Sequence, residues 1–559
     1  MEEILEKFGN PGKYHILIAI MLSITWWSVC LGTVAMSFYG TTPNYTCDIE
    51  FSIKLNNETF SSDVSLLNIT ESEDHCSYAL DGHDRKLCHK WIYYDEGAGK
   101  ETVSTEWDLV CGDTYRVSLA STLFFCGVFV GALVFGFVAD HLGRKKTLAI
   151  CLYTQMPISL AIAFMPSYVP FTIMRFVLGI WLQGVSSVAF LHCIEFFRQK
   201  YRGVVMVGFG ISWAFAQLLA TGIAYFVTDW RHMQIIASGL ALVTVPYFWW
   251  LPESPRWLQV KGRHTEITSD FIPKASRMNG LNVTEMVDWC AIRLQELRQS
   301  QTGAGSSESD QSFVRMLKTP VLLLRLAGMC FMWYVASMTY YIFIFNTANL
   351  AGDQYLNFAI GAGLEILVNL FMLYILARWN RKYPLLAACC LIGIVCVISG
   401  AVPKTCCANT INISWIVTAF ALCGKMVSAA FLCLIFVYAA ELFPTFARGS
   451  CLALCGCSMR VGGIVAPQVL YLAVKTFDQF PYVVVAVKIF ICIVITLLLP
   501  DTFKKSMPNT IEEAVNMAPE PTSDRVRGGN SLLYRCGNSP ASETSSNSTE
   551  PEKHKLVEA

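Results

Sequence analysis

Apolar runs long enough to cross a lipid bilayer recur along nearly the whole chain. This feature constrains the fold more than any other. A helix needs about 20 residues to span the hydrocarbon core of a membrane. Runs of about this length occupy twelve segments: 16–38, 117–139, 147–165, 169–194, 204–226, 233–251, 321–345, 355–377, 384–403, 413–440, 450–474 and 480–500. We therefore predict an all-α membrane protein with twelve transmembrane helices.

The composition agrees with a membrane environment. The chain has 559 residues, of which 54% are hydrophobic and only 15% charged, whereas soluble proteins carry about 25% charged residues. Lys plus Arg balances Asp plus Glu, at 42 each, so no overall field points to a nucleic-acid partner. The start, Met1-Glu2-Glu3, is acidic, whereas a signal peptide begins with positive charge. We interpret the first run as an uncleaved helix.

Basic residues in the short connections set the expected orientation. Three connections on one side of the predicted bundle are rich in Lys and Arg: Arg144, Lys145 and Lys146; Arg198, Lys200 and Arg202; Arg378, Arg381 and Lys382. By the positive-inside rule these face the cytoplasm. The predicted organisation is a cytoplasmic N-terminus (1–15), a six-helix half (16–251) with an extracellular loop (40–115), a cytoplasmic linker (252–320), a second six-helix half (321–500) and a cytoplasmic tail (501–559). The tail is polar and we expect it to be disordered.

The 40–115 loop carries the marks of an extracellular segment. It contains three N-x-[ST] glycosylation sequons, at Asn44, Asn57 and Asn68. It also contains four cysteines, which would form disulfides outside the cell: Cys47, Cys76, Cys88 and Cys111. Four cysteines allow three pairings, and the spacing does not choose between them. Both features favour a plasma-membrane protein with this loop outside.

Short motifs repeat between the two halves in the same order and at similar spacing. Glu195-x6-Arg202 follows the fourth predicted helix, and Glu441-x6-Arg448 follows the tenth. Pro252-Glu253-Ser254 and Gly143-Arg144-Lys145 return as Pro500-Asp501-Thr502 and Asn380-Arg381-Lys382. The match predicts a duplicated six-helix unit, in which a central site between the halves would serve alternating access.

The repeated charges suit a gate at the cytoplasmic helix ends. An arginine grips a carboxylate through two parallel hydrogen bonds, so such pairs could join the two halves and separate when the inner side opens. The candidate gating residues are Asp140, Arg144, Glu195, Arg202, Glu441 and Arg448.

These motifs resemble those of the major facilitator superfamily. Gly136-x3-Asp140-x2-Gly143-Arg144-Lys145 resembles its loop 2–3 signature, and Pro252-Glu253-Ser254-Pro255-Arg256-Trp257-Leu258 resembles the signature after helix 6. The resemblance implies the major facilitator fold, with 12 transmembrane helices in two six-helix repeats. One departure is the second-half loop, which keeps Arg381-Lys382 but lacks the Asp and Gly of the first-half signature.

More narrowly, the chain is similar to solute carrier family 22, the organic cation, organic anion and carnitine transporters. Three stretches carry this likeness: Glu106-Trp107-Asp108-Leu109-Val110-Cys111 at the end of the outer loop, Glu441-Leu442-Phe443-Pro444-Thr445, and Gly462-Gly463-Ile464 to Pro467. The resemblance covers about residues 1–515. It implies a secondary transporter of small organic ions that works by alternating access.

Ionisable residues inside predicted helices are candidate substrate contacts, because each costs about 2.5–3.5 kcal/mol to insert. Glu365, Lys425 and Arg460 lie deepest, whereas Arg175 and Lys488 are shallower. By resemblance, Glu365 matches a glutamate of the cation and carnitine members. Arg460 falls where cation members tend to have Asp and anion or carnitine members tend to have Arg. The two would suit a zwitterion; the alternative is an internal ion pair that only locks helices together.

Aromatic and amide side chains complete the candidate binding residues. Aromatic rings can complement a quaternary ammonium group through cation–π contact, although any single aromatic residue more often serves packing. Tyr340-Tyr341 also resembles a pair in the family's helix 7. The candidates are Tyr340, Tyr341, Phe190, Trp213, Gln183 and Gln217, together with Trp26 and Trp27.

The sequence contains no nucleotide cradle, no metal-ligand spacing and no nucleophile elbow. We therefore expect no enzyme activity, no cofactor and no metal; the partners would be the lipid bilayer, a small organic ion and a possible co-transported or exchanged ion. Carnitine-like or betaine-like zwitterions rank first as substrates, organic anions second and organic cations third. A transport-inactive receptor-like member and a channel are the alternatives, and duplicated gate motifs argue against both.

Overall fold

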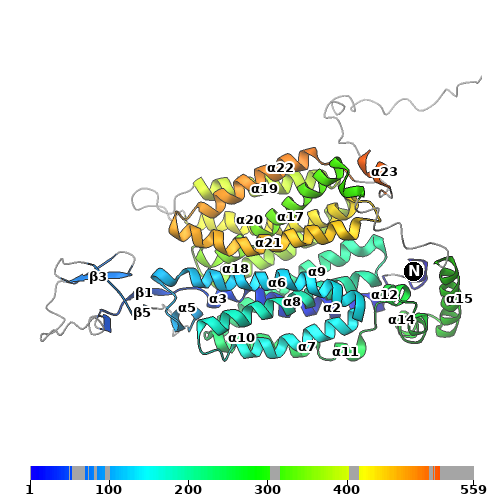
Figure 1. The fold of residues 1–559 in the computed structure, drawn as a ribbon, viewed down its shortest axis with the longest axis horizontal. Coiled ribbons are helices and arrows are strands. Elements are labelled where there is room, and N and C mark those ends of the chain that lie inside the picture. The colour runs from blue at the N-terminus through cyan, green and yellow to red at the C-terminus, as the bar shows by residue number, and fades with distance from the viewer. Residues whose placement is uncertain are drawn as a thin grey trace, which may run out of the picture. The chain divides into compact units, whose positions relative to one another are not determined.

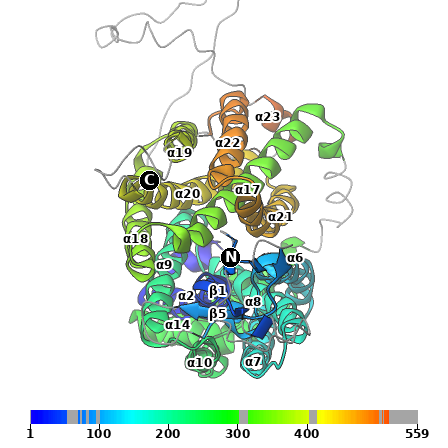
Figure 2. The same cartoon turned by 90° about the vertical axis from the view of Figure 1, so that its left-hand side faces the viewer.

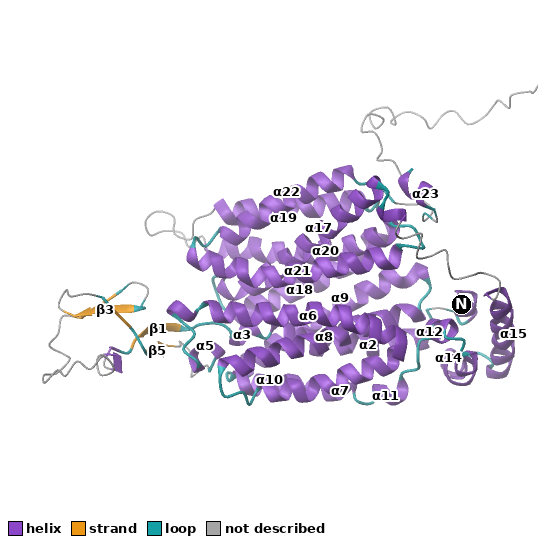
Figure 3. Cartoon of the chain, viewed as in Figure 1, coloured by secondary structure: helices purple, strands orange, loops and turns teal. Residues whose placement is uncertain are grey.

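The computed structural model describes residues 2–9, 11–49, 51–52, 69–72, 75–80, 85–94, 101–301, 315–401, 414–502, 508 and 510–516. They belong to one compact unit, Met1–Ala518. Figure 3 shows that this unit is built from long helices, with short strands confined to one end.

Each of the twelve predicted segments forms a helix in the described part of the chain. The first half contains α2 (Lys13–Val34), α3 (Met36–Tyr39), α6 (Tyr115–Leu142), α7 (Arg144–Ile162), α8 (Tyr168–Phe196), α9 (Arg202–Phe226), α10 (Trp230–Leu240), η4 (Ala241–Thr244) and α11 (Tyr247–Trp250). The second contains α17 (Pro320–Asn346), α18 (Gln354–Arg378), α19 (Lys382–Ala401), α20 (Ser414–Leu442), α21 (Arg448–Lys475) and α22 (Phe480–Leu498).

Eleven helices among the described residues are long and apolar enough to cross a membrane. Helix α7 falls outside this set, because Arg144, Lys145 and Lys146 occupy its first turn and lower its mean hydropathy. It nevertheless packs against α8 and α10 and so belongs to the helix group of the first half.

The helices gather into two groups that match the predicted repeat. Figures 1 and 2 show α17–α22 on one side and α2–α10 on the other. Each group has its own cluster of buried apolar side chains. The groups meet where α9 packs against α18 and where α6 packs against α21. Any cavity that lies between the two groups is therefore bounded by helices from both.

The strands lie at the end of the bundle that carries the 40–115 segment, which we call the loop end (Figure 1). β1 (Asn44–Cys47) pairs antiparallel with β5 (Trp91–Tyr94), and β2 (Ile69–Glu71), β3 (Ser77–Leu80) and β4 (Lys86–Leu87) form an antiparallel sheet in that order. The disulfides join Cys47 to Cys88 and Cys76 to Cys111, which decides the pairing that the sequence left open. Asn44 is exposed; Asn57 and Asn68 lie outside the described residues.

The 252–320 segment contains helices at the opposite end, which we call the terminal end (Figure 1). They are α12 (Pro255–Val260), α13 (His264–Glu266), η5 (Ile267–Phe271), α14 (Ile272–Asn279) and α15 (Val283–Gln301). The N-terminal helix α1 (Glu2–Lys7) is anchored among them and on the α8–α9 connection by ion pairs: Glu2–Arg256 at 2.5 Å, Glu3–Arg293 at 2.6 Å and Glu6–Arg198 at 3.0 Å. Ile4 and Leu5 are fully buried beneath it.

The prediction of a disordered tail from Asp501 onward is wrong for its first part. Residues 511–515 form helix α23 (Ile511–Val515), whose N-cap Thr510 accepts a hydrogen bond from the Glu513 amide. Ala514 is fully buried, and its carbonyl accepts a hydrogen bond from Arg325 of α17 at 2.5 Å. Although the surrounding sequence is polar, the buried Ala514 and its hydrogen bond to Arg325 are enough to hold this short helix against α17. Residues 517–559 lie outside the described part of the chain.

Candidate functional site

A cavity of about 370 Å³ lies between the two halves. Its walls come from α2, α6, α8 and α9 of the first half and from α17, α18, α20 and α21 of the second. The volume lies within the usual range for small-molecule sites, about 300–1,000 Å³. The lining is mostly apolar, with a few charged and polar side chains that can orient a ligand.

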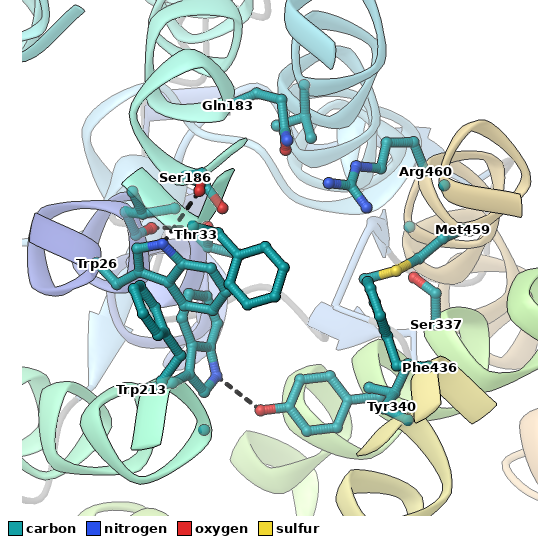
Figure 4. Close-up of a pocket in the computed structure, with 18 of the residues that line it drawn as sticks. Trp26, Thr33, Gln183, Ser186, Trp213, Ser337, Tyr340, Phe436, Met459 and Arg460 are labelled. Atoms are coloured by element: carbon teal, nitrogen blue, oxygen red, sulfur yellow. Dashed lines mark hydrogen bonds between the residues drawn. The ribbon is translucent and has the colours of Figure 1, made fainter. Parts of the chain in front are cut away.

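Arg460 of α21 is the charged group that projects most plainly into this cavity. Figure 4 shows its guanidinium pointing between Gln183 and Tyr340 toward the open space. Its buried Nε atom has no hydrogen-bond partner within the described residues. Tyr341 lies close enough to interact with its charge. An unpaired guanidinium in an apolar cavity favours a carboxylate or another anionic group.

Aromatic rings form the wall opposite Arg460 (Figure 4). The Trp26 ring lies 4.9 Å from Phe209 and 6.1 Å from Trp213, measured between ring centroids. Phe190 extends this wall to Phe436 of the second half, at 6.3 Å. Such a wall offers ring faces to an apolar group or to an organic cation.

Glu365 of α18 is held in a hydrogen-bond network at the edge of the cavity. Its Oε1 atom accepts a hydrogen bond from the Tyr340 hydroxyl at 2.8 Å, and its Oε2 atom accepts one from the Gln217 amide at 2.8 Å. The oxygen of the same Gln217 amide accepts a hydrogen bond from Lys425 at 2.8 Å. Trp213 donates to the Tyr340 hydroxyl at 2.7 Å. The glutamate and lysine charges are thus bridged by one neutral side chain.

This network joins the two halves, because Gln217 belongs to α9 whereas Glu365 and Lys425 belong to α18 and α20. The Lys425 ammonium also lies 5.8 Å from the Phe358 ring. Glu365 is 3% exposed and Lys425 is fully buried. Burying either charge alone would cost several kcal/mol, so the bridge stabilises both and leaves Arg460 as the unbalanced charge beside the cavity.

Aromatic contacts close the loop end beyond this network. The Phe38 ring of α3 lies 4.6 Å from Phe358 and is stacked at 6.3 Å on Tyr355, both at the start of α18. Gln354 donates to the Ser37 carbonyl at 2.8 Å, and Gln468 of α21 donates to the Thr122 hydroxyl of α6 at 2.8 Å. The two halves are therefore in direct contact on this side of the cavity.

The first-half gating residues form one cluster at the terminal end. The Arg144 guanidinium bonds to Asp140 at 2.9 Å and to Glu195 at 3.0 Å. Glu253 accepts hydrogen bonds from the backbone amides of Arg144 and Lys145, at 2.9 and 3.0 Å. These amides begin α7, and a carboxylate is favourable at a helix N-terminus.

The second-half cluster repeats only part of this arrangement. Arg381 bonds to Glu441 at 3.1 Å, and the Thr502 hydroxyl donates to the other carboxylate oxygen at 2.8 Å. Each gate carboxylate thus pairs with an arginine of its own half, so the pairing between halves that we predicted is not their arrangement here.

Arg202 and Arg448, the first residues of α9 and α21, are placed differently from the prediction. Each has a buried Nε atom without a hydrogen-bond partner in the described part of the chain. The charge of Arg448 acts unfavourably on Arg202, whereas Glu2 and Glu195 act favourably on it.

Most of the predicted binding residues come together. Eight of them line the cavity: Arg460, Glu365, Tyr340, Tyr341, Gln183, Phe190, Trp213 and Trp26. Gln217 and Lys425 lie behind Glu365, and Trp27 donates to Ser212 instead. Arg175 is buried against Tyr39 and Phe124, and Lys488 bonds to Tyr334. Sequence reasoning missed other lining residues, which carry no motif: Thr33, Ser186, Ser187, Trp333, Ser337, Phe436 and Met459.

Two six-helix halves around a central cavity define a transporter of the major facilitator type. A family model described as "Sugar (and other) transporter" matches residues 57–513. Since this match covers most of the chain, the protein belongs to that family, which is a family of transporters and not of enzymes.

Individual relatives narrow the class. The chain is 29% identical to the organic cation transporter protein of Drosophila melanogaster, over 95% of this chain and 98% of that protein. It is 27% identical to solute carrier family 22 member 6-A of Xenopus laevis (93% and 95% covered) and 26% identical to solute carrier family 22 member 1 of Bos taurus (92% and 93% covered). The predicted resemblance to solute carrier family 22 is confirmed by these relatives, and the protein is a multi-pass membrane transporter.

Solved structures share the fold. The inward open conformation of the xylose transporter XylE from E. coli matches with a TM-score of 0.58 and 15% identity, over 89% of this chain and 99% of that one. Its partially occluded inward open conformation matches with a TM-score of 0.57 and 15% identity, over 87% and 99%. At this identity the likeness establishes the major facilitator fold alone.

Proposed function

We propose that this transporter carries small zwitterions of the carnitine-like or betaine-like kind across the plasma membrane by alternating access. The observation that carries the proposal is the unpaired Arg460 guanidinium facing an aromatic wall across one cavity. A carboxylate would bind Arg460, and the ammonium end would lie against the rings of Trp26 and Trp213. Glu365, at the cavity edge, adds negative potential for the ammonium end.

Organic anions are the second candidate, and a specific observation favours them. Glu365 is already hydrogen-bonded to Tyr340 and Gln217, and Gln217 links it to Lys425. The unbalanced charge is then that of Arg460, which attracts an anion whether or not the substrate carries a positive group.

The test is uptake into cells that express the full chain, with labelled carnitine-like zwitterions, aromatic organic anions and quaternary cations compared at equal concentration. Saturable zwitterion uptake stimulated by substrate on the opposite side supports the proposal. Uptake of anions alone selects the second candidate. No uptake by protein at the cell surface would favour a transport-inactive member, and currents without saturation would favour a channel.

Arg460→Asp tests the binding role directly. A charge-assisted hydrogen bond contributes about 1.5–3 kcal/mol, so the variant should lose roughly tenfold or more in apparent affinity for carboxylate-bearing substrates. Arg460→Lys keeps the charge and should lose less. Equal loss for cations and carboxylates, with normal surface expression, would make Arg460 a structural residue. Glu365→Gln should weaken zwitterions more than anions if Glu365 faces the ammonium end.

The same proposal places the terminal end in the cytoplasm and the disulfide-bearing loop outside the cell. The positive residues of the short connections support this orientation, as do the sequons of the loop. Glycosidase treatment should increase the electrophoretic mobility of the protein. Substituting Asn44, Asn57 and Asn68 together by Gln should abolish that shift. Asn282 is a sequon in the 252–320 linker, which this topology places in the cytoplasm, so Asn282→Gln should leave the shift unchanged. A shift that persists in the triple variant would overturn the topology.

A further inference from the structure

Two free cysteines of the second half lie in contact beside the cavity. The Sγ atoms of Cys330 in α17 and Cys455 in α21 are 3.8 Å apart. Among the free thiols of the described residues, this is the pair whose sulfur atoms the structure places in direct contact. A disulfide needs Cα atoms within about 7 Å and a bond of about 2.05 Å, so the two helix backbones must also lie close.

The backbones of α17 and α21 do lie close at a neighbouring position. A Cβ atom added at Gly462 of α21 would come 2.3 Å from the carbonyl oxygen of Tyr334 in α17. Cys330 lies one turn before Tyr334 and Cys455 two turns before Gly462, and their sulfur atoms, now 3.8 Å apart, must come about 1.8 Å closer to bond. Cys330 also lies within interaction range of Ser458, the residue two before Arg460.

The thiol pair adjoins residues that form the cavity wall. Cys455 directly precedes Gly456, and Met459 and Arg460 follow one turn later; all three line the cavity. On the other helix, Trp333 lies one turn beyond Cys330 and lines it too. A covalent bond between the thiols would draw their sulfur atoms from 3.8 Å to about 2.05 Å and so displace these two walls of the cavity relative to one another.

We propose that Cys330 and Cys455 are an oxidation site at which a hydroperoxide forms a disulfide that arrests transport. One thiol, as its thiolate, attacks a peroxide oxygen and becomes a sulfenic acid, and the O–O bond breaks to release water or an alcohol. The second thiol attacks the sulfenic sulfur, the S–S bond forms and water leaves. Two electrons pass from the thiols to the peroxide, and a dithiol reverses the reaction. The disulfide would act on the walls of the cavity, so we expect the same inhibition whichever organic ion is carried.

The experiment uses the full chain in proteoliposomes, hydrogen peroxide as the oxidant and dithiothreitol as the reductant. Initial uptake of a labelled substrate is measured before and after each treatment. Wild-type uptake should fall several-fold with peroxide and return with dithiothreitol. Mass spectrometry of a non-reducing digest should identify a peptide pair that joins Cys330 to Cys455. The single variants Cys330→Ser and Cys455→Ser should keep their uptake under peroxide.

The matched control is Cys396→Ser, which removes another buried thiol of the same half that does not line the cavity and should remain sensitive to peroxide. Cys330→Ala and Cys455→Ala replace the serine variants if those do not reach the membrane. Inhibition that persists in both single variants would overturn the proposal, as would a Cys330–Cys455 bond that forms without loss of uptake. Absence of this bond in protein whose other thiols are oxidised would also overturn it.

Discussion

The gate clusters of the two halves begin from the same sequence motifs and reach different structures. In the first half, Arg144 bonds two carboxylates, Asp140 and Glu195, and its side chain is 9% exposed. In the second half, Arg381 bonds Glu441 and two backbone carbonyls, and its side chain is 15% exposed. The arginine–glutamate pair is common to both, and the supporting groups differ.

The supporting groups differ most where each half begins its third helix. In the first half, the Glu253 carboxylate accepts hydrogen bonds from the amides at the start of α7. In the second half, the Lys382 ammonium at the start of α19 donates to the carbonyls of Leu497 and Leu499, at 2.8 and 2.7 Å. In the first half, a carboxylate accepts hydrogen bonds at the start of α7. In the second half, a lysine at the start of α19 instead donates hydrogen bonds to the end of α22.

The comparison shows which part of the duplicated motif is shared. The arginine–glutamate pair is kept in both halves, whereas the groups around it vary with the local packing. The first-half cluster is also anchored to the N-terminal helix, since Arg198 and Arg256 beside it bind Glu6 and Glu2. We therefore expect the first-half cluster to be the more rigid of the two.

The largest expected effect comes from removing the central arginine of each cluster. Arg144→Ala leaves Glu195, whose side chain is only 13% exposed, without its partner, and breaking a largely buried pair costs about 3 kcal/mol. Uptake per molecule at the cell surface should fall more than tenfold, with a lower thermal unfolding temperature. Arg381→Ala should lose less on both measures because its cluster is more exposed. Arg378→Ala, at an exposed position close to Arg381 in the sequence, is the control. Equal losses of uptake and stability in Arg144→Ala and Arg381→Ala would contradict the comparison.

A smaller effect should follow from Glu253→Gln. The change removes a negative charge from the start of α7, where it interacts favourably with the helix dipole, at a cost of about 1 kcal/mol. Thermal unfolding of the purified protein measures the loss. Asp501→Asn makes the matched change in the second half and should cost less, because Lys382 holds α19 there. A larger loss of stability for Asp501→Asn than for Glu253→Gln would contradict this expectation, because the second half would then depend more on its acid than the first half does.

Ala377→Asp should make the second cluster more like the first. Asp140 lies four residues before Arg144, and Ala377 lies four residues before Arg381 and is exposed. A new carboxylate at this spacing should bond Arg381 and stabilise the protein by about 0.5 kcal/mol. The gain should appear as a higher unfolding temperature at low salt and shrink at high salt. It should vanish in the Ala377→Asp, Arg381→Gln double variant; a gain that survives there has another cause.

The smallest effect is expected at the N-terminal helix. Glu6→Gln removes an ion pair with Arg198 whose side chains are 62% and 29% exposed. Exposed pairs of this kind contribute at most about 0.5 kcal/mol after screening by solvent. Unfolding temperatures at low salt should therefore differ slightly from wild type and converge at high salt. Glu285→Gln is an exposed control. A loss comparable to that of Arg144→Ala would mean that α1 is part of the gate itself.

Much of the fold was predictable because membrane helices are defined by local composition. The predicted span 169–194 is contained within α8, and 204–226 and 321–345 match α9 and α17 closely. A long apolar run has no other stable structure in lipid, where every backbone polar group must be satisfied within the chain. The strands of the loop end and the helices of the linker were not predicted. Their stability depends on disulfides and on ion pairs between distant segments.

The candidate site was predictable only in part. Charges such as Arg460 and Glu365 stand out in an apolar run because each is costly to bury there. Phe436 and Met459 line the same cavity and look like any other helical apolar residues, so no signal could have identified them. The partner of Glu195 could not be predicted from the sequence either, because both Arg144 and Arg202 belong to the candidate gate. Only the packing of the helices decides that Glu195 pairs with Arg144.

The sequence by itself determined that this protein is a twelve-helix membrane transporter built from two repeats, since hydropathy and repeated motifs are local properties that survive without a structure. The tertiary structure decided which charges meet. It joined Glu365 to Lys425 through Gln217 and left the Nε atom of the cavity-lining Arg460 without a hydrogen-bond partner among the described residues. These outcomes depend on distances between helices that are remote in the chain, and Coulomb and hydrogen-bond energies depend on those distances.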